Sequence, residues 1–238
     1  MQTPPSRARE RCDLIGASPY SDRPDGLFSP YLGAAHRLTL ERLTAWMREA
    51  GMSITVDAAG NIVGRYGGLS REAPALLLGS HVDSVENGGR YDGMLGVMLG
   101  IEVVDHFHRL GKRFPFALEV IGFGDEEGSR FPLYMLGSRA VAGCLAAVDG
   151  EVRDRNGVTL AEALSEWDLT VERLALARRD NVIAYVEAHI EQAPHLERAE
   201  RPLGVVRGIA SQLRYNVTFS GMAAHAGTVL RERFDALA

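Results

Sequence analysis

Side chains that can bind a metal ion or move a proton recur along this chain in short clusters. His81 and Asp83 form a His-x-Asp pair, Glu126 and Glu127 are adjacent acids, and His189 stands in a third polar segment. Imidazole and carboxylate ligands without thiolate suit Zn²⁺, Mn²⁺, Co²⁺ or Ni²⁺. These residue types therefore predict a centre in which divalent cations activate water, and they leave the identity of the metal open.

Each cluster has a plainer interpretation when it is taken alone. A lone His-x-Asp is typical of a polar strand end, adjacent acids suit the start of a helix, and Asp92 in an Asp-Gly step fits a turn. The prediction of a metal centre therefore depends on the clusters occurring together. We interpret the histidines that stand apart from any second ligand as structural or solvated: His36, His106, His108 and His195.

The clusters together favour a site for two cations. Two metals about 3.5–4 Å apart need a bridging carboxylate together with terminal His and Glu ligands. Asp92 is the candidate for that bridge. In the pair of His81 and Asp83, we expect the acid to accept the free imidazole N–H and thereby to fix the tautomer of the ring.

Apolar segments precede these clusters and predict the strands that position them. Residues 75–78 and 116–123 are apolar without alternation, as in strands covered on both faces, and residues 181–189 form a third strand-like run. Residues 94–110 predict a helix whose glycines offer a flat face for close packing. Strand, helix, strand with a polar cluster at each carboxyl end is the α/β pattern, in which ligands gather beyond those ends.

Further elements are expected on either side of this unit. Residues 34–49 carry apolar residues at helical spacing, and residues 53–56 and 61–66 predict a hairpin. Residues 159–167 predict a helix that begins with a capping-box-like Thr-Leu-Ala-Glu. All of these elements fit one α/β domain.

The pattern changes near Ser211. Residues 213–219 alternate apolar and polar with a period of two, which predicts a strand with one face in water and therefore a different sheet. We therefore expect a catalytic domain over residues 1–210 and the beginning of a second domain over residues 211–238.

Composition excludes several classes of function. The chain has 238 residues, a formal net charge of −5 and 46% hydrophobic residues, so a basic surface for nucleic acid is not expected. Cys12 and Cys144 are too few for a disulfide framework, and the N-terminus has no apolar core of a secretory signal. No apolar run is long enough to span a membrane. We expect a cytoplasmic protein that acts on a small molecule.

Six segments of the chain resemble one family in the family's own order. They are GSHVDS (79–84), GGRYDG (88–93), FGDEEGSRF (123–131), LGSRA (136–140), HIEQ (189–192) and HAGT (225–228). Together they resemble the hydantoinase/carbamoylase branch of the M20 metallopeptidase-like amidohydrolases, over nearly the whole chain. That branch includes allantoate amidohydrolases, N-carbamoyl-L-amino acid hydrolases and β-ureidopropionases.

The resemblance implies a fold and a set of roles. The fold would be a mixed β-sheet flanked by helices, a zinc-aminopeptidase-like catalytic domain, followed by the start of an inserted α+β dimerisation domain of a homodimer. The resemblance makes Asp92 the bridging ligand of two divalent ions, zinc or manganese with cobalt or nickel possible. The other roles that it implies are first-metal ligands for His81 and His189, a second-metal ligand for Glu127, the general base for Glu126, and oxyanion stabilisation for His225. Gln192 and Arg139 resemble polar residues that face the substrate or order a loop.

The chain also departs from this family. Family members are longer, and their catalytic domain resumes after the inserted domain with one more histidine for the second metal. The resemblance therefore implies that the first metal site is complete here and that the second, with Asp92 and Glu127 alone, is incomplete. Ala193 stands where the family has Gly, and residues 229–233 lack the family's Thr-Pro-Met. We expect a C-terminally truncated member, and an inactive fragment is a competing hypothesis.

The expected reaction is hydrolysis of a non-peptide C–N bond in a linear amidine or carbamoyl compound. Residues 116–128 and 89–97 resemble allantoate amidohydrolases most closely, which favours allantoate with release of ammonia. N-carbamoyl-L-amino acid hydrolysis is the close alternative, and an exopeptidase or deacylase of the same superfamily is less favoured because of HIEQ and HAGT.

Overall fold

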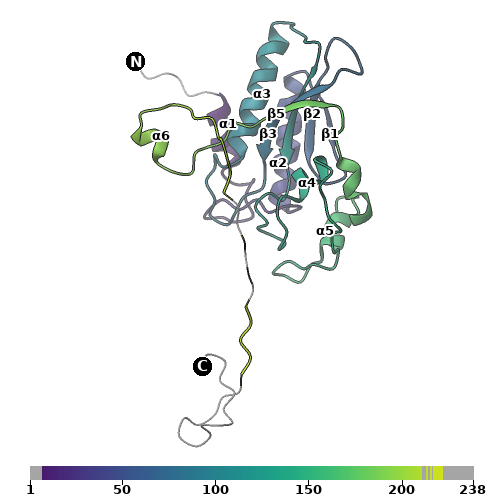
Figure 1. Ribbon diagram of the computed structural model, residues 1–238, viewed down its shortest axis with the longest axis vertical. Helices are drawn as coiled ribbons and strands as arrows, with labels where there is room; N and C mark the ends of the chain where they lie inside the picture. Colours follow the sequence, from purple (N-terminus) through teal and green to yellow (C-terminus); the bar gives the residue numbers. More distant parts are fainter. Residues whose placement is uncertain (1–6, 211–212, 214, 216, 222–238) are drawn as a thin grey trace, which may run out of the picture. The chain divides into compact units, whose positions relative to one another are not determined.

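The computed structural model describes residues 7–210, 213, 215 and 217–221 (Figure 1). The chain divides into two compact units, Met1–Gln192 and Ala193–Ala238. The first unit holds the sheet and most of the helices. In the second unit the one helix among the described residues is the short α6, His195–Arg198. The boundary predicted between residues 210 and 211 remains a prediction.

Five strands form one mixed sheet within the described part of the chain, in the order β1-β2-β4-β3-β5. The strands β1 and β2 make an antiparallel hairpin, and β2 is also antiparallel to β4. The strands β3 and β5 both run parallel to their neighbours, β4 and β3 respectively. Their bounds are Ser53–Val56 for β1, Ile62–Tyr66 for β2, Ala75–His81 for β3, Ala117–Phe123 for β4 and Val182–Val186 for β5.

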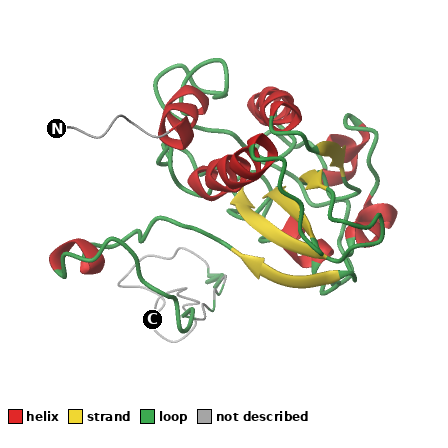
Figure 2. Cartoon of the chain, turned by 90° about the horizontal axis from the view of Figure 1, so that it is seen from above, coloured by secondary structure: helices red, strands yellow, loops and turns green. Residues whose placement is uncertain are grey.

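The helices that pack on the sheet follow the predicted pattern. The helix α2, Ala34–Glu49, packs on β1 and β2, and α3, Met94–Arg109, packs on β3 and β4. Figure 2 shows these helices on one side of the strands. A Cβ atom at Gly100 would lie 3.1 Å from Val120 of β4, so the absence of a side chain there lets the helix approach the sheet.

A main hydrophobic core lies between these helices and the sheet, and a second core lies beneath the shorter helices. The second core includes Tyr31, Phe131 and Leu160. It is covered by α4, Leu136–Val141, by α5, Leu160–Ser165, and by a 3-10 helix, Val171–Ala177. Thr159 and Glu162 form the capping box that the sequence predicted, with each side chain bonded to the backbone amide of the other residue.

The central strand β4 carries one buried charge. Every residue of β4 is buried, Glu119 included. Its carboxylate accepts a 2.6 Å hydrogen bond from Arg65 and a short one from Arg179. The burial of every residue confirms that β4 is covered on both faces. The two guanidinium groups neutralise the one charged side chain, which makes its burial tolerable.

Two features of the first unit differ from the expectations. The helix α1, Arg7–Ile15, was not predicted; it packs on α3, and Arg7 binds Asp105 at 2.6 Å. The strand β5 is mostly exposed rather than buried, because it is the last strand of the sheet order. The strand predicted over residues 213–219 stays a prediction, because residues 214 and 216 lie outside the described residues.

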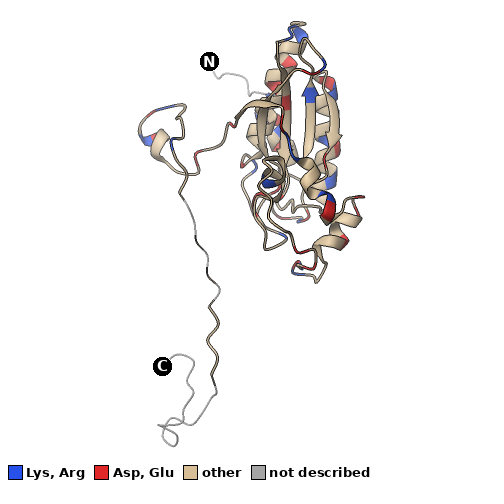
Figure 3. Cartoon of the chain, turned by 45° about the vertical axis from the view of Figure 1, so that its right-hand side comes forward, with Lys and Arg blue, Asp and Glu red and all other residues tan. Residues whose placement is uncertain are grey.

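The surface and the helices agree with the composition. Basic and acidic residues are interspersed over the first unit rather than gathered by sign (Figure 3). Among the described residues, none of the helices has the length and apolar character that crossing a bilayer requires.

Candidate metal centre

The predicted metal ligands meet at one edge of the sheet. His81 is the last residue of β3 and lies beside Phe123, the last residue of β4. Glu126 and Glu127 follow β4, and His189 follows β5 by three residues. Because these three strands are parallel, their carboxyl ends bring the side chains to the same edge.

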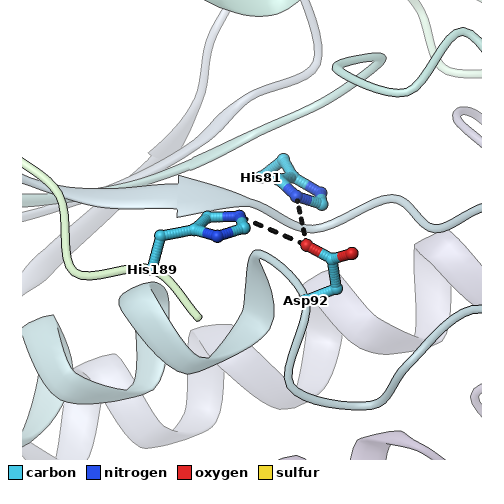
Figure 4. A group of neighbouring side chains, drawn as sticks. All are labelled: His81, Asp92 and His189. Atoms are coloured by element: carbon cyan, nitrogen blue, oxygen red, sulfur yellow. Dashed lines mark ion pairs between the residues drawn. The ribbon is translucent and has the colours of Figure 1, made fainter. Parts of the chain in front are cut away.

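Two histidines and one aspartate converge on a single point (Figure 4). Asp92 Oδ1 lies 3.5 Å from His81 Nε2 and 3.2 Å from His189 Nε2. In a tetrahedral zinc site with bonds of about 2.0–2.1 Å, neighbouring ligand atoms lie about 3.3 Å apart. The two separations from Asp92 Oδ1 therefore match those of ligands that share one cation, and all three ligand atoms lie within 4.8 Å of one another.

The tautomers of the two imidazoles also fit a cation. His81 Nδ1 lies 2.9 Å from the carbonyl oxygen of Asp83, and His189 Nδ1 lies 2.8 Å from that of Ile190. A carbonyl only accepts, so each Nδ1 carries a proton, and in the neutral form of each ring the lone pair of Nε2 faces Asp92. Asp92 Oδ1 is itself buried and accepts no hydrogen bond. When both rings are neutral, three acceptor atoms face one another, and a proton or a metal ion between them relieves their repulsion.

Electrostatics at this cluster are consistent with a positive charge between these atoms. Burial alone lowers the pKa of His81, but the neighbouring carboxylates of Asp92 and Asp83 outweigh it and raise the pKa to about 9. The His81 imidazole is the main cause that lowers the pKa of Asp92. The cluster thus attracts either an extra proton or a metal ion.

A second group of possible ligands shares His81. Ligand atoms of His81, Glu126 and Glu127 all lie within 4.8 Å of one another. Burial is the main cause that raises the pKa of Glu127. A carboxylate that is costly to leave charged in this position is stabilised by a cation beside it.

The carboxylate of Asp83 makes different contacts from those expected. Its carboxylate lies 3.9 Å from His81 Nδ1, and its backbone carbonyl, rather than the carboxylate, takes the imidazole N–H. The carboxylate instead accepts the backbone amides of Glu126 and Glu127, each at 3.1 Å. Asp83 therefore holds the turn that carries the two glutamates.

Asp92 is positioned by a turn before α3 and by Gln192. The turn needs Gly93, whose φ is 63° and whose Cβ atom, if present, would lie 2.5 Å from the ring of His81. Gln192 Nε2 donates to Asp92 Oδ2 at 2.8 Å. The residue predicted to face the substrate therefore contacts the candidate bridging carboxylate.

Two further polar residues lie near the centre, and the sequence predicted no role for either of them. Asn61 accepts the backbone amide of Gly124 at 3.0 Å and donates to the carbonyl of Gly137 at 3.3 Å, so it ties β2 to the loop that carries the glutamates. Both carboxylate oxygens of Asp125 are buried without a hydrogen bond, and burial raises its pKa to about 9. Asn61 looked like an ordinary strand start, and Asp125 could not be distinguished from the acids that follow it.

The remaining predicted residues are less informative. His225 lies outside the described residues, so its predicted role remains a prediction. Arg139 lies on α4. His36 is buried between the rings of Tyr31 and Trp167, as its structural interpretation predicted.

Comparison with known proteins gives consistent matches. Residues 77–233 match peptidase family M20/M25/M40. The chain is 45% identical over 208 residues to the N-carbamoyl-L-amino acid amidohydrolase of Geobacillus stearothermophilus, covering 86% of this chain and 51% of that protein. It is 42% identical over 215 residues to allantoate deiminase 1 of Glycine max, covering 88% and 44% respectively.

Solved structures agree with these relatives. A hydantoinase/carbamoylase family amidase from Burkholderia ambifaria superposes with a TM-score of 0.71 at 37% identity, covering 82% of this chain and 46% of that one. The chain spans about half the length of the curated relatives that it matches.

Proposed function

Because this chain belongs to peptidase family M20/M25/M40, we propose that it holds divalent metal ions and hydrolyses a non-peptide C–N bond in a small carbamoyl or amidine compound. The observation that carries the proposal is the convergence of two imidazole nitrogens on Asp92 Oδ1, at 3.5 and 3.2 Å, with each Nδ1 already bonded to a carbonyl.

The proposed ligands fall into two groups. His81, Asp92 and His189 hold the first ion, and Asp92 and Glu127 contribute to the second. Nitrogen and carboxylate donors without thiolate suit zinc or manganese, with cobalt and nickel as further possibilities. Glu127 belongs to the same group of neighbouring ligand atoms as His81, which supports a second ion close to the first.

A pair of divalent cations at this position would polarise the substrate and make a water molecule more acidic. Glu126 then takes a proton from the attacking water as general base and delivers it to the leaving nitrogen as the C–N bond breaks. Its backbone amide is held by Asp83, which keeps the side chain beside the ligands. We assign His225 to the stabilisation of negative charge on the substrate in the tetrahedral transition state.

Allantoate, with release of ammonia, is the first choice of substrate. Support comes from the resemblance of residues 116–128 and 89–97 to allantoate amidohydrolases and from the 42% identity to the soybean allantoate deiminase. N-carbamoyl-L-amino acids are the second choice, and the 45% identity to the Geobacillus enzyme favours them.

The test is a comparison of substrates after loading with Zn²⁺, Mn²⁺ or Co²⁺. Ammonia release from allantoate is measured beside release of the free amino acid from N-carbamoyl-L-amino acids. Turnover of allantoate alone supports the first choice, and turnover of carbamoyl compounds alone rejects it. Elemental analysis separates both from an inactive fragment, because a chain that retains no metal would contradict the proposed centre.

The same proposal extends to assembly and location. We propose that residues 1–210 form the catalytic part, that residues 211–238 begin a dimerisation domain, and that the protein acts as a homodimer on a small molecule. Cys12 and Cys144 are free thiols, which supports a reducing, cytoplasmic compartment. Size-exclusion chromatography with light scattering tests the dimer.

A further inference from the structure

The position of His189 needs an explanation beyond backbone pairing. The parallel register of β3 and β5 ends at the pair Leu78 and Val186. His81 remains within the ladder, since it pairs with Phe123 of β4. His189 lies three residues past the end of β5, so the ladder that fixes His81 does not reach it.

A side-chain link continues where the ladder stops. Ser80 Oγ, on the residue next to His81, donates a short hydrogen bond to Glu187 Oε1. Tyr185 donates its hydroxyl to Glu187 Oε2 at 2.9 Å. Ser80 is buried, with 1% of its surface exposed. The Glu187 carboxylate therefore joins the end of β3 to the segment that leaves β5.

Tyr185 is well placed to remain the donor in this link. Burial and the neighbouring Glu187 carboxylate raise the pKa of its hydroxyl. Its ring packs edge-on against Phe123 with the ring centroids 5.9 Å apart. The hydroxyl thus stays protonated, and the ring is held against the last residue of β4.

The helix α3 confines the same segment from the other side. A Cβ atom at Gly96 would lie 2.4 Å from the carbonyl oxygen of Ala188 and 2.9 Å from Ser80 Cβ. Ala188 lies between Glu187 and His189, so the first turn of α3 touches this segment. Glu187 therefore bonds to the end of β3, and Ala188 lies against the first turn of α3.

We propose that Glu187 is a positioning residue for the metal centre. Its carboxylate, bound by Ser80 and Tyr185, sets the distance between His189 and the pair of His81 and Asp92. This inference rests on the proposed metal centre and adds a residue that orients a ligand without touching the metal. Ligand distances in metal sites hold to about 0.2 Å, and losing a residue that orients a ligand costs about 10–100-fold in metal affinity.

Cobalt binding tests the proposal without using catalytic activity. Co²⁺ is titrated into the metal-free 238-residue protein while its visible absorption, which reports coordination number and geometry, is recorded. For Glu187→Ala we expect Co²⁺ affinity about 10–100-fold below wild type and an altered spectrum. Glu187→Gln is expected to recover most of the affinity, because a carboxamide still accepts from Ser80 and donates to the Tyr185 oxygen.

Milder variants and a matched control complete the test. Ser80→Ala removes the hydrogen bond to Glu187, and Tyr185→Phe removes the hydroxyl that is shared between Glu187 and the carbonyl of Gly79. Each variant leaves one side-chain bond to Glu187 in place and is expected to lower the affinity less than Glu187→Ala does. Tyr20→Phe is the control, because it also removes one hydroxyl that bonds to a side chain, that of Arg42 at 2.9 Å. Its Co²⁺ affinity and spectrum should match those of wild type.

The outcomes separate this inference from the proposed function. If Glu187→Ala binds Co²⁺ with the affinity and spectrum of wild type, Glu187 has no positioning role, even if the metal-free variant unfolds at a lower temperature. If wild type itself binds no Co²⁺, the metal centre is refuted and this inference falls with it.

Discussion

Replacing Gly93 with alanine is the sharpest test of whether His81 binds a metal. Gly93 has a φ of 63°, and a Cβ atom there would lie 2.5 Å from three atoms of the His81 ring. Carbon atoms in contact normally lie about 3.5 Å apart, so the ring must retreat by about 1 Å. Metal sites tolerate about 0.2 Å in ligand distance. The displacement of His81 therefore exceeds the tolerance about fivefold.

Gly111→Ala provides a matched control. Gly111 has a φ of 61°, and its Cβ atom would meet nothing within 4 Å. Both variants place an alanine at positive φ, which costs about 1–2 kcal/mol in the left-handed region. Gly93, with a ψ of −54°, lies outside that region and is strained further, and only Gly93→Ala presses on a proposed ligand. In the metal-free state the free energy of unfolding therefore falls in both variants, and it falls further in Gly93→Ala because of its ψ and its contact with His81.

The assay compares metal affinity across the three proteins. Zn²⁺ binding is measured by competition with a chromophoric chelator, and urea unfolding of the metal-free proteins gives the strain. We expect Gly93→Ala to lose about 100-fold or more in affinity, and Gly111→Ala to bind like wild type. Equal affinity in the two variants would show that His81 is not a ligand and would refute the reasoning.

Three further predictions address the base, the turn and a buried histidine. Glu126→Gln should lower kcat by about 10²–10⁴-fold while Co²⁺ affinity is retained; full turnover in steady-state kinetics would remove Glu126 from the base role. Asp83→Asn loses one of the two acceptors for the amides of Glu126 and Glu127, so urea unfolding should show a loss of about 1–3 kcal/mol. Burial lowers the pKa of His36 to about 3, below the unfolded value of about 6.5. Between these pH values only the unfolded chain takes up the proton, so stability is full above about pH 6.5 and falls by up to about 1.4 kcal/mol per pH unit as the pH drops toward 3. His36→Asn should flatten that dependence in urea titrations from pH 7 to 4, and an unchanged slope would contradict the assignment.

Sequence patterns predicted most of the first unit. The helix α2, the hairpin of β1 and β2, and the β3-α3-β4 unit lie where hydrophobic periodicity or an unbroken apolar run indicated. Periodicity is a reliable signal there because each element buries a face or is covered on both sides. The α/β class and the mixed sheet flanked by helices are confirmed, and so is the family.

Long-range contacts limited the rest of the prediction. The helix α1 begins in a charged segment and is held by its ion pair with Asp105, far away along the chain. The strand β5 has an apolar sequence but an exposed place at the sheet edge. A local sequence pattern does not indicate which other element a segment packs against. The helix α1 and the exposure of β5 could therefore not be predicted from the sequence.

By itself, then, the sequence determined which side chains could take part in the chemistry, because each of them ends a strand, follows one or precedes a helix in a recognisable segment: His81, Asp92, Glu126, Glu127 and His189. Only the tertiary structure decided how they are oriented. In the structure each imidazole donates from Nδ1 to a backbone carbonyl, and the carboxylate of Asp83 accepts the backbone amides of Glu126 and Glu127. Hydrogen bonds of this kind require segments that are distant along the chain to be placed to within a few tenths of an ångström, and residue spacing in the sequence does not carry that information.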